Sequence, residues 1–126
     1  MNITERYKDY SPKVQEYMKC VINSLNQDYG DGWPDSWLIS LDTLADHLFL
    51  YTEAIADIRE KGTSHVNREG RQVKNPNITV LSNAMGAIRD IIKSFAFSPT
   101  SRQKLELLNK VDSDTVVDNY VASLTQ

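Results

Sequence analysis

Cysteine, glycine and proline are all scarce in this chain, and each scarcity excludes a class of protein. Cys20 is the only cysteine among the 126 residues, so neither an intrachain disulfide, nor a zinc cluster, nor a CxxC redox motif can form. Five glycines and four prolines are too few for a fibrous or disordered chain. With 40% hydrophobic and 25% charged residues, the composition is that of a globular protein with one core.

Long hydrophobic runs are missing too. No stretch approaches the roughly 18 consecutive apolar residues that a membrane span requires. The first residues, MNITERYKDYSPK, contain no apolar core of a signal peptide. We therefore expect a cytosolic protein without a membrane partner.

Catalytic and metal-binding patterns are also absent. His47 and His65 are the only histidines, and the HExxH, GxGxxG, Walker lysine and GxSxG patterns do not occur. A row of acidic residues on one predicted helix could hold a divalent ion in a small metal-dependent hydrolase, but a solvated helix face is the favoured interpretation. The row consists of Asp42, Asp46, Glu53 and Asp57. We therefore expect no enzymatic activity, no cofactor and no metal.

Apolar residues at three- and four-residue spacing predict several helices, of which three are long. The first begins with Ser11 and Pro12, a capping hydroxyl followed by proline in the first turn, and ends near Tyr29, before Gly30. The following loop, residues 30–39, contains two tryptophans between glycine and proline. We expect these rings to cover the core of their own domain.

The second and third long helices are marked by similar signals. The second is predicted to run from a cap at Ser40 to Gly62, and the third from a cap at Asn75, with Pro76 in its first turn, to about residue 95. Gly86 lies inside the third helix, where glycine is unfavourable, and so predicts a close approach of two helices.

Both of these helices carry broad apolar stripes. Such stripes usually form an intrachain core, but their breadth in so short a chain leaves apolar surface for contact with another copy. The candidate oligomer-interface residues are Leu41, Leu44, Leu48, Tyr51, Ile55, Leu81, Ile88 and Ile92.

Two weaker helical signals follow. Ser98 and Pro99 repeat the start signal for a further helix, in which Leu105 and Leu108 face inward. Residues from 112 onward again show helical spacing, which predicts a short helix or a partner-binding tail. The apolar positions of this tail are Val117, Tyr120, Val121 and Leu124.

Between the second and third long helices the helical period is lost. Val66 and Val73 flank the polar link 67–70, Asn-Arg-Glu-Gly, which suits a hairpin built on a type I turn. The predicted fold is therefore mainly α: four to five helices, with one short β-hairpin at about residues 63–75.

The hairpin region is the one basic segment in a chain of net charge −3. Residues 1–58 carry four Lys/Arg and ten Asp/Glu, residues 59–74 carry five and two, and residues 75–126 carry five of each. Cations on a protruding hairpin can contact several DNA phosphates, although a solvated turn is the alternative. The candidate DNA-binding residues are Arg59, Lys61, Arg68, Arg71 and Lys74.

Three segments, in this order and spacing, carry a resemblance to a known family. They are LYTEAI at residues 50–55, VKNP at 73–76 and SPTSR at 98–102. Over roughly residues 12–108 the chain resembles the small subunit of tailed-phage DNA-packaging terminases.

The resemblance implies a non-catalytic role in the host cytoplasm. Family members assemble as homo-oligomeric rings, recognise viral double-stranded DNA at the packaging start site and pass it to a large subunit with ATPase and nuclease activity. Residues 1–110 would form the family domain, and residues 111–126 a C-terminal tail or short helix. Only its position, not the resemblance, makes this tail a candidate for contact with the large subunit. An obvious N-terminal helix-turn-helix is absent, however. The alternative is a helical adaptor of phage or bacterial origin that binds another protein and has no packaging role.

Overall fold

The computed structural model describes residues 3–105, and this part of the chain is helical apart from one hairpin. The prediction of a mainly α fold, with the hairpin between the second and third long helices, is confirmed. The predicted boundary at residue 110 and the tail at 111–126 lie outside the described residues. The elements are α1 (Ile3–Arg6), α2 (Pro12–Tyr29), the 3-10 turn η1 (Gly30–Gly32), α3 (Trp37–Lys61), β1 (Ser64–Val66), β2 (Gln72–Lys74) and α4 (Asn77–Ser94), and residues 99–105 are also helical.

Helix α2 begins and ends as its sequence predicts. The Ser11 hydroxyl accepts a hydrogen bond from the Val14 N–H at 3.4 Å, and Pro12 is the first helical residue. At the other end Gly30 has φ 71°, and its N–H donates to the carbonyl of Asn26. Glycine adopts this left-handed conformation without steric cost, so the chain can leave the helix there.

Helix α3 begins earlier than predicted. Ser40 is not its cap, because the helix starts at Trp37 and the Trp37 N–H already donates to the Pro34 carbonyl at 3.0 Å. The Trp37 ring packs edge-on against Tyr29, with centroids 5.2 Å apart, and against Phe95 at 5.5 Å. These contacts come from other parts of the chain and favour a helix start that local capping signals do not indicate.

The two tryptophans cover the core, as expected. Trp33 and Trp37 stack with centroids 6.2 Å apart, and both are partly buried against the core. The Trp33 indole N–H donates to the Asn26 side-chain oxygen at 2.9 Å, so its one polar group is satisfied.

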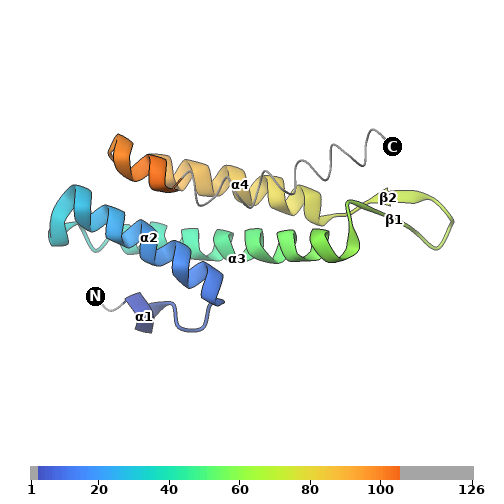
Figure 1. Cartoon of the computed structure of the whole chain (residues 1–126), viewed down its shortest axis with the longest axis horizontal. Helices are drawn as coiled ribbons and strands as arrows, with labels where there is room; N and C mark the ends of the chain where they lie inside the picture. Colours follow the sequence, from blue (N-terminus) through green and yellow to red (C-terminus); the bar gives the residue numbers. More distant parts are fainter. Residues whose placement is uncertain (1–2, 106–126) are drawn as a thin grey trace.

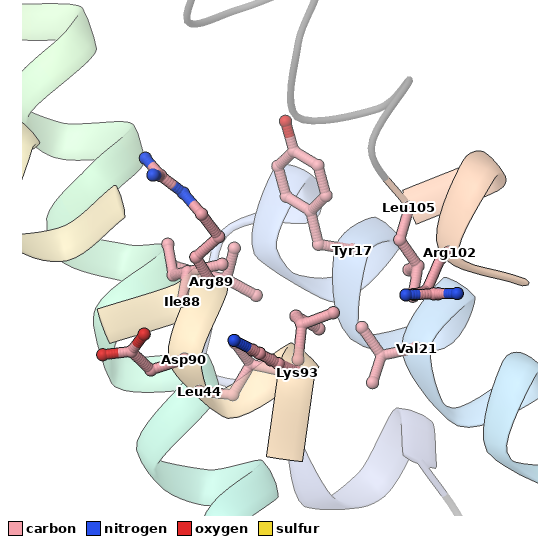
Figure 2. Close-up of a pocket in the computed structure, with 11 residues that line it drawn as sticks. Tyr17, Val21, Leu44, Ile88, Arg89, Asp90, Lys93, Arg102 and Leu105 are labelled. Carbon is pink, nitrogen blue, oxygen red and sulfur yellow. The ribbon is translucent and has the colours of Figure 1, made fainter. Parts of the chain in front are cut away.

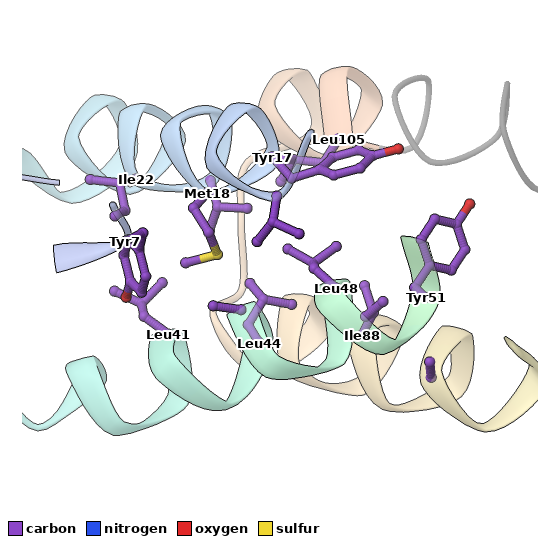
Figure 3. Close-up of a cluster of buried hydrophobic side chains, with 14 of the residues drawn as sticks. Tyr7, Tyr17, Met18, Ile22, Leu41, Leu44, Leu48, Tyr51, Ile88 and Leu105 are labelled. Carbon is purple, nitrogen blue, oxygen red and sulfur yellow. The ribbon is translucent and has the colours of Figure 1, made fainter. Parts of the chain in front are cut away.

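Helix α3 is the central element of the molecule. It packs against both α2 and α4, with α4 running back along it in the opposite direction, and the hairpin extends past the ends of α3 and α4 (Figure 1). In the core, Met18 and Ile22 of α2 face Leu41 and Leu44 of α3 (Figure 3). The prediction of a close approach at Gly86 is wrong: a Cβ atom there would meet nothing within 4 Å.

The chain after α4 is held by the end of α2. The Ser98 hydroxyl accepts a hydrogen bond from the Ser101 N–H at 3.2 Å, which confirms the predicted helix start. Asp28 accepts from the Ser98 N–H at 2.7 Å and from the Ser101 hydroxyl at 3.1 Å. Leu105 is buried, as predicted, whereas Leu108 lies outside the described residues.

Candidate nucleic-acid interface

The hairpin is a two-stranded antiparallel ribbon with its cations on different sides. Ser64 pairs with Lys74, His65 with Val73 and Val66 with Gln72. Side chains of directly paired residues share a face, and successive pairs alternate between faces. Lys74 therefore lies on the face of Ser64, opposite that of Val73. Val66 is 68% exposed, so the ribbon does not cover the core and is free to contact a ligand.

The turn of the hairpin is organised by one side chain. The Asn67 side-chain oxygen accepts hydrogen bonds from the N–H groups of Glu69, at 3.0 Å, and Arg71, at 2.9 Å. The Gly70 N–H donates to the Asn67 carbonyl at 3.1 Å, and Gly70 has φ 80°. This combination is typical of a type I turn followed by a left-handed residue, and it places Arg68 at the tip.

Three of the five candidate cations are exposed on this ribbon. Arg68, Arg71 and Lys74 are all solvent-exposed, and none forms an ion pair within residues 3–105. From Ser64 at its base to Arg68 at its tip, one arm of the ribbon spans four residue steps, or about 13 Å at the usual rise of a strand. The three charges are therefore spread along an extended element, an arrangement suited to several phosphates of one backbone.

The other two candidates lie at the base. Arg59 and Lys61 are exposed in the last turn of α3. The Lys61 ammonium is 2.9 Å from the Asp57 carboxylate, so its charge is already partly balanced. Among the five candidates, Lys61 therefore takes part in a structural feature at the base of the hairpin.

That feature is a polar cluster, here called the anchor, formed by Asp57, Lys61, Gly62, Asn75 and Asn77. The buried Asn75 amide donates to Asp57 at 3.0 Å and to the Gly62 carbonyl at 2.9 Å. Its oxygen accepts from the Asn77 N–H at 2.9 Å, which confirms the predicted cap. The Asn77 amide also donates to Asp57, at 2.7 Å. The anchor therefore joins the end of α3, the end of the hairpin and the start of α4.

The anchor changes the acidity of its carboxylate. Hydrogen bonds from Asn75, Lys61 and Asn77, in that order of importance, lower the pKa of Asp57 to about 2. Because hydrogen bonds to the ionised form favour it, the carboxylate stays charged at neutral pH and keeps all its donors in place.

Two other members of the acidic row have structural partners as well. Asp42 accepts two hydrogen bonds from Arg6, at 2.9 and 2.6 Å, and one from the Tyr7 hydroxyl at 3.0 Å. The Tyr10 hydroxyl donates to Asp46, an interaction that raises the pKa of Tyr10 to about 12. These contacts fasten the N-terminal segment to α3. In the part of the chain that the structure describes, no group of three or more potential ligands could hold a metal ion.

The predicted oligomer-interface residues lie mostly in the core of the single chain. Seven of the eight are buried, with exposed fractions between 0 and 5%. In this conformation these side chains pack mostly within their own chain, among α2, α3 and α4. The buried residues are Leu41, Leu44, Leu48, Tyr51, Ile55, Leu81 and Ile88, and Ile92 is partly buried.

Three apolar side chains of α3 remain exposed: Ile39, at 74%, Phe49 and Leu50. The sequence already shows that Phe49 and Leu50 lie off the main apolar stripe of this helix. Ile39 was not singled out, although it precedes Leu50 by eleven residues and so lies on nearly the same side of the helix. No helix within residues 3–105 has the length and apolar character to cross a membrane.

Comparison with known protein families places a match over most of the described helices and the hairpin. The family model described as phage terminase, small subunit, matches residues 37–112, which include α3, the hairpin and α4. Searches of curated proteins and of solved structures found no significant match.

Proposed function

The chain belongs to the phage terminase small-subunit family, and we propose that it serves genome packaging by recognising viral double-stranded DNA at the packaging start site. In this proposal it acts in the host cytoplasm as an oligomeric ring, has no catalytic activity, and recruits or regulates the large ATPase and nuclease subunit. Family membership supports the packaging role. The remaining steps rest on the physical features below.

The observation that carries DNA recognition is the basic hairpin. Arg68, Arg71 and Lys74 are exposed, form no ion pair with the described part of the chain, and are spread along a ribbon that projects past the helices (Figure 1). Neutralising phosphates with such side chains releases counterions, which is the main source of affinity in non-specific DNA binding. The anchor fixes the base of the ribbon to α3 and α4, so the cations are presented by a rigid support.

A ring would compensate for the small number of cations on each chain. Three phosphate contacts per subunit give weak binding, but subunits joined in one assembly bind a single DNA at high effective concentration. The subunit contacts of the ring are best sought at Ile39, Phe49 and Leu50, because these apolar side chains are exposed.

The test is the salt dependence of binding to fragments that together cover the phage genome, measured by fluorescence anisotropy. The double variant Arg68→Gln/Arg71→Gln should weaken binding and reduce the slope of log K against log salt by about 0.9 for each lost phosphate contact. The matched control is Lys19→Gln/Lys104→Gln, which removes the same charge from exposed positions on α2 and residues 99–105. This control should retain the wild-type slope.

Two results would contradict the proposal. Equal losses in both double variants would mean that only overall charge matters, and the hairpin would have no special role. A wild-type protein that binds none of the fragments would favour the alternative, a helical adaptor whose basic hairpin is incidental.

A further inference from the structure

We propose that the C-terminal segment, residues 106–126, folds back onto its own chain, with the amphipathic stretch 117–124 bound in a groove between α2 and α4. The proposal does not depend on DNA binding by the hairpin, because it concerns a surface at a different place on the molecule.

The groove has a volume of about 350 Å³ and an apolar floor. Because α2 and α4 both pack on α3, they leave a channel between them. Val21 of α2, Leu44 and Leu48 of α3, and Ile88 and Ile92 of α4 line this channel. Its size is within the range of sites that enclose several apolar groups.

The rim of the groove is basic. Arg89 lies on one side and Arg102 on the other, with Lys93 between them (Figure 2). Among the described residues that line the groove, Asp90 is the one acidic residue, so this part of the rim carries a net positive charge. An occupant should therefore combine apolar groups with negative charge.

Residues 106–126 have both properties. They contain four acidic residues and one lysine, so their charge is opposite to that of the rim. Val117, Tyr120, Val121 and Leu124 recur at the spacing that puts them on one helical face. An apolar face laid in an apolar groove is a recurring way in which helices are bound.

The segment also starts at the right place. Leu105 is the last described residue and itself lines the groove. Eleven residues, 106–116, separate it from Val117. Such a length spans up to about 35 Å when extended, which is enough for the apolar face to turn back into the groove. Attachment to the same chain gives this occupant a high effective concentration that a free partner lacks.

The test measures the accessibility of the groove in the full chain. In a Cys20→Ser background, Ile92→Cys places one thiol in the groove, and its rate of reaction with a soluble thiol reagent reports whether the groove is covered. Val117→Asp/Val121→Asp should release the segment and raise this rate about tenfold. Thr115→Asp/Asn119→Asp adds the same charge to the opposite helical face and should leave the rate within about twofold of the parent.

A control thiol, Ser82→Cys, lies on an exposed part of α4 outside the groove. It should react equally fast in chains with the parent tail and with the Val117→Asp/Val121→Asp tail. Urea unfolding checks that each variant is folded. If a tail variant does not fold, bismaleimide cross-linking of Ile92→Cys to Val117→Cys, with the rest of the tail unchanged, gives the answer instead. A cross-linked species of monomer mass supports the proposal. The proposal would be overturned if Val117→Asp/Val121→Asp folds and its thiol reacts at the same rate as in the parent. It would also be overturned if protection of the groove disappears on dilution, because a second copy would then be the occupant.

Discussion

At the scale of single residues, two glycines differ in what an added methyl group would do. Gly86 lies in the middle of α4, and a Cβ atom there would meet nothing within 4 Å. Gly70 has equally open surroundings, but its φ of 80° belongs to the left-handed region. Open space around a glycine is therefore not sufficient for alanine to stabilise the protein. The backbone conformation decides whether the substitution raises or lowers stability.

We expect Gly86→Ala to raise the free energy of unfolding by about 0.5–1 kcal/mol, because alanine restricts the unfolded chain and is favoured in a helix. Gly70→Ala should lower it by about 1–2 kcal/mol, because alanine is strained in the left-handed conformation. Urea unfolding followed by circular dichroism measures both. A loss of stability in Gly86→Ala would show that α4 makes a close contact at this position after all.

Asn75 shows how far sequence reasoning reaches for one residue. Its place before Pro76 predicted a helix cap, and the hydrogen bond from the Asn77 N–H confirms it. The same side chain also donates to Asp57, 18 positions earlier, and to the Gly62 carbonyl. Capping depends on local order and can be predicted from it. The contact with α3 depends on how the hairpin folds back, which no local pattern contains.

At the scale of elements, the anchor decides how firmly the hairpin is attached. A two-stranded ribbon is marginally stable by itself, and β1 and β2 contain three residues each. The hydrogen bond from the Asn75 N–H to the Thr63 carbonyl continues the ladder to the anchor, at 2.8 Å. The polar cluster around Asp57 therefore replaces the apolar face that a larger sheet would bury.

The anchor should depend on pH in a defined window. The folded pKa of Asp57, about 2, is below the value of about 3.9 for an unfolded chain. A lowered folded pKa means that the contribution to stability is complete above about pH 4 and is lost as the pH falls toward 2. The stability difference between the wild type and Asp57→Asn, from urea unfolding, should be constant from pH 7 to about 5 and shrink below pH 4. A difference that persists unchanged down to pH 2 would contradict this assignment.

The elements themselves were largely predictable because their signals are local. Ser11 and Pro12, the glycines at 30 and 62, and the Asn67 turn each specify a boundary within a few residues, and the structure has these boundaries. Ser40 was wrong as the cap of α3, because the aromatic contacts of Trp37 favour a helix that begins four residues earlier than predicted. The tertiary contacts of the Trp37 ring thus had more influence on where the helix begins than the local capping signal at Ser40.

At the scale of the whole molecule, the ring proposed above requires a surface that joins its copies. The heptad-like stripes of α3 and α4 suggested an interface, but their side chains fill the core. Periodicity tells which residues share a helix face, and it does not tell whether that face meets the same chain or another. The groove was missed for a related reason, because it exists only where several elements from distant parts of the sequence meet.

The proposed ring makes a prediction about assembly. Native mass spectrometry of the wild type at micromolar concentration should show a closed oligomer, and Phe49→Ser/Leu50→Ser should shift it to smaller species by removing apolar contact area. The control Val66→Ser/Val73→Ser removes two exposed apolar side chains from the hairpin and should retain the oligomer. An intact oligomer in the α3 variant would exclude this surface. A wild type that remains monomeric, with or without DNA, would count against the ring.

The position of the tryptophans has a consequence for spectroscopy. Trp33 and Trp37 stack beside η1 and the start of α3, and the start of α3 lies at the end of the molecule remote from the hairpin (Figure 1). The 25-residue α3 separates the two ends, and a helix of that length spans about 37 Å. Intrinsic emission therefore reports on the junction of α2, α3 and the end of α4, where Trp37 meets Phe95. DNA bound at the hairpin should leave the tryptophan emission spectrum unchanged. In one sample, tryptophan emission can therefore report folding, while a dye attached near residue 68 reports DNA binding.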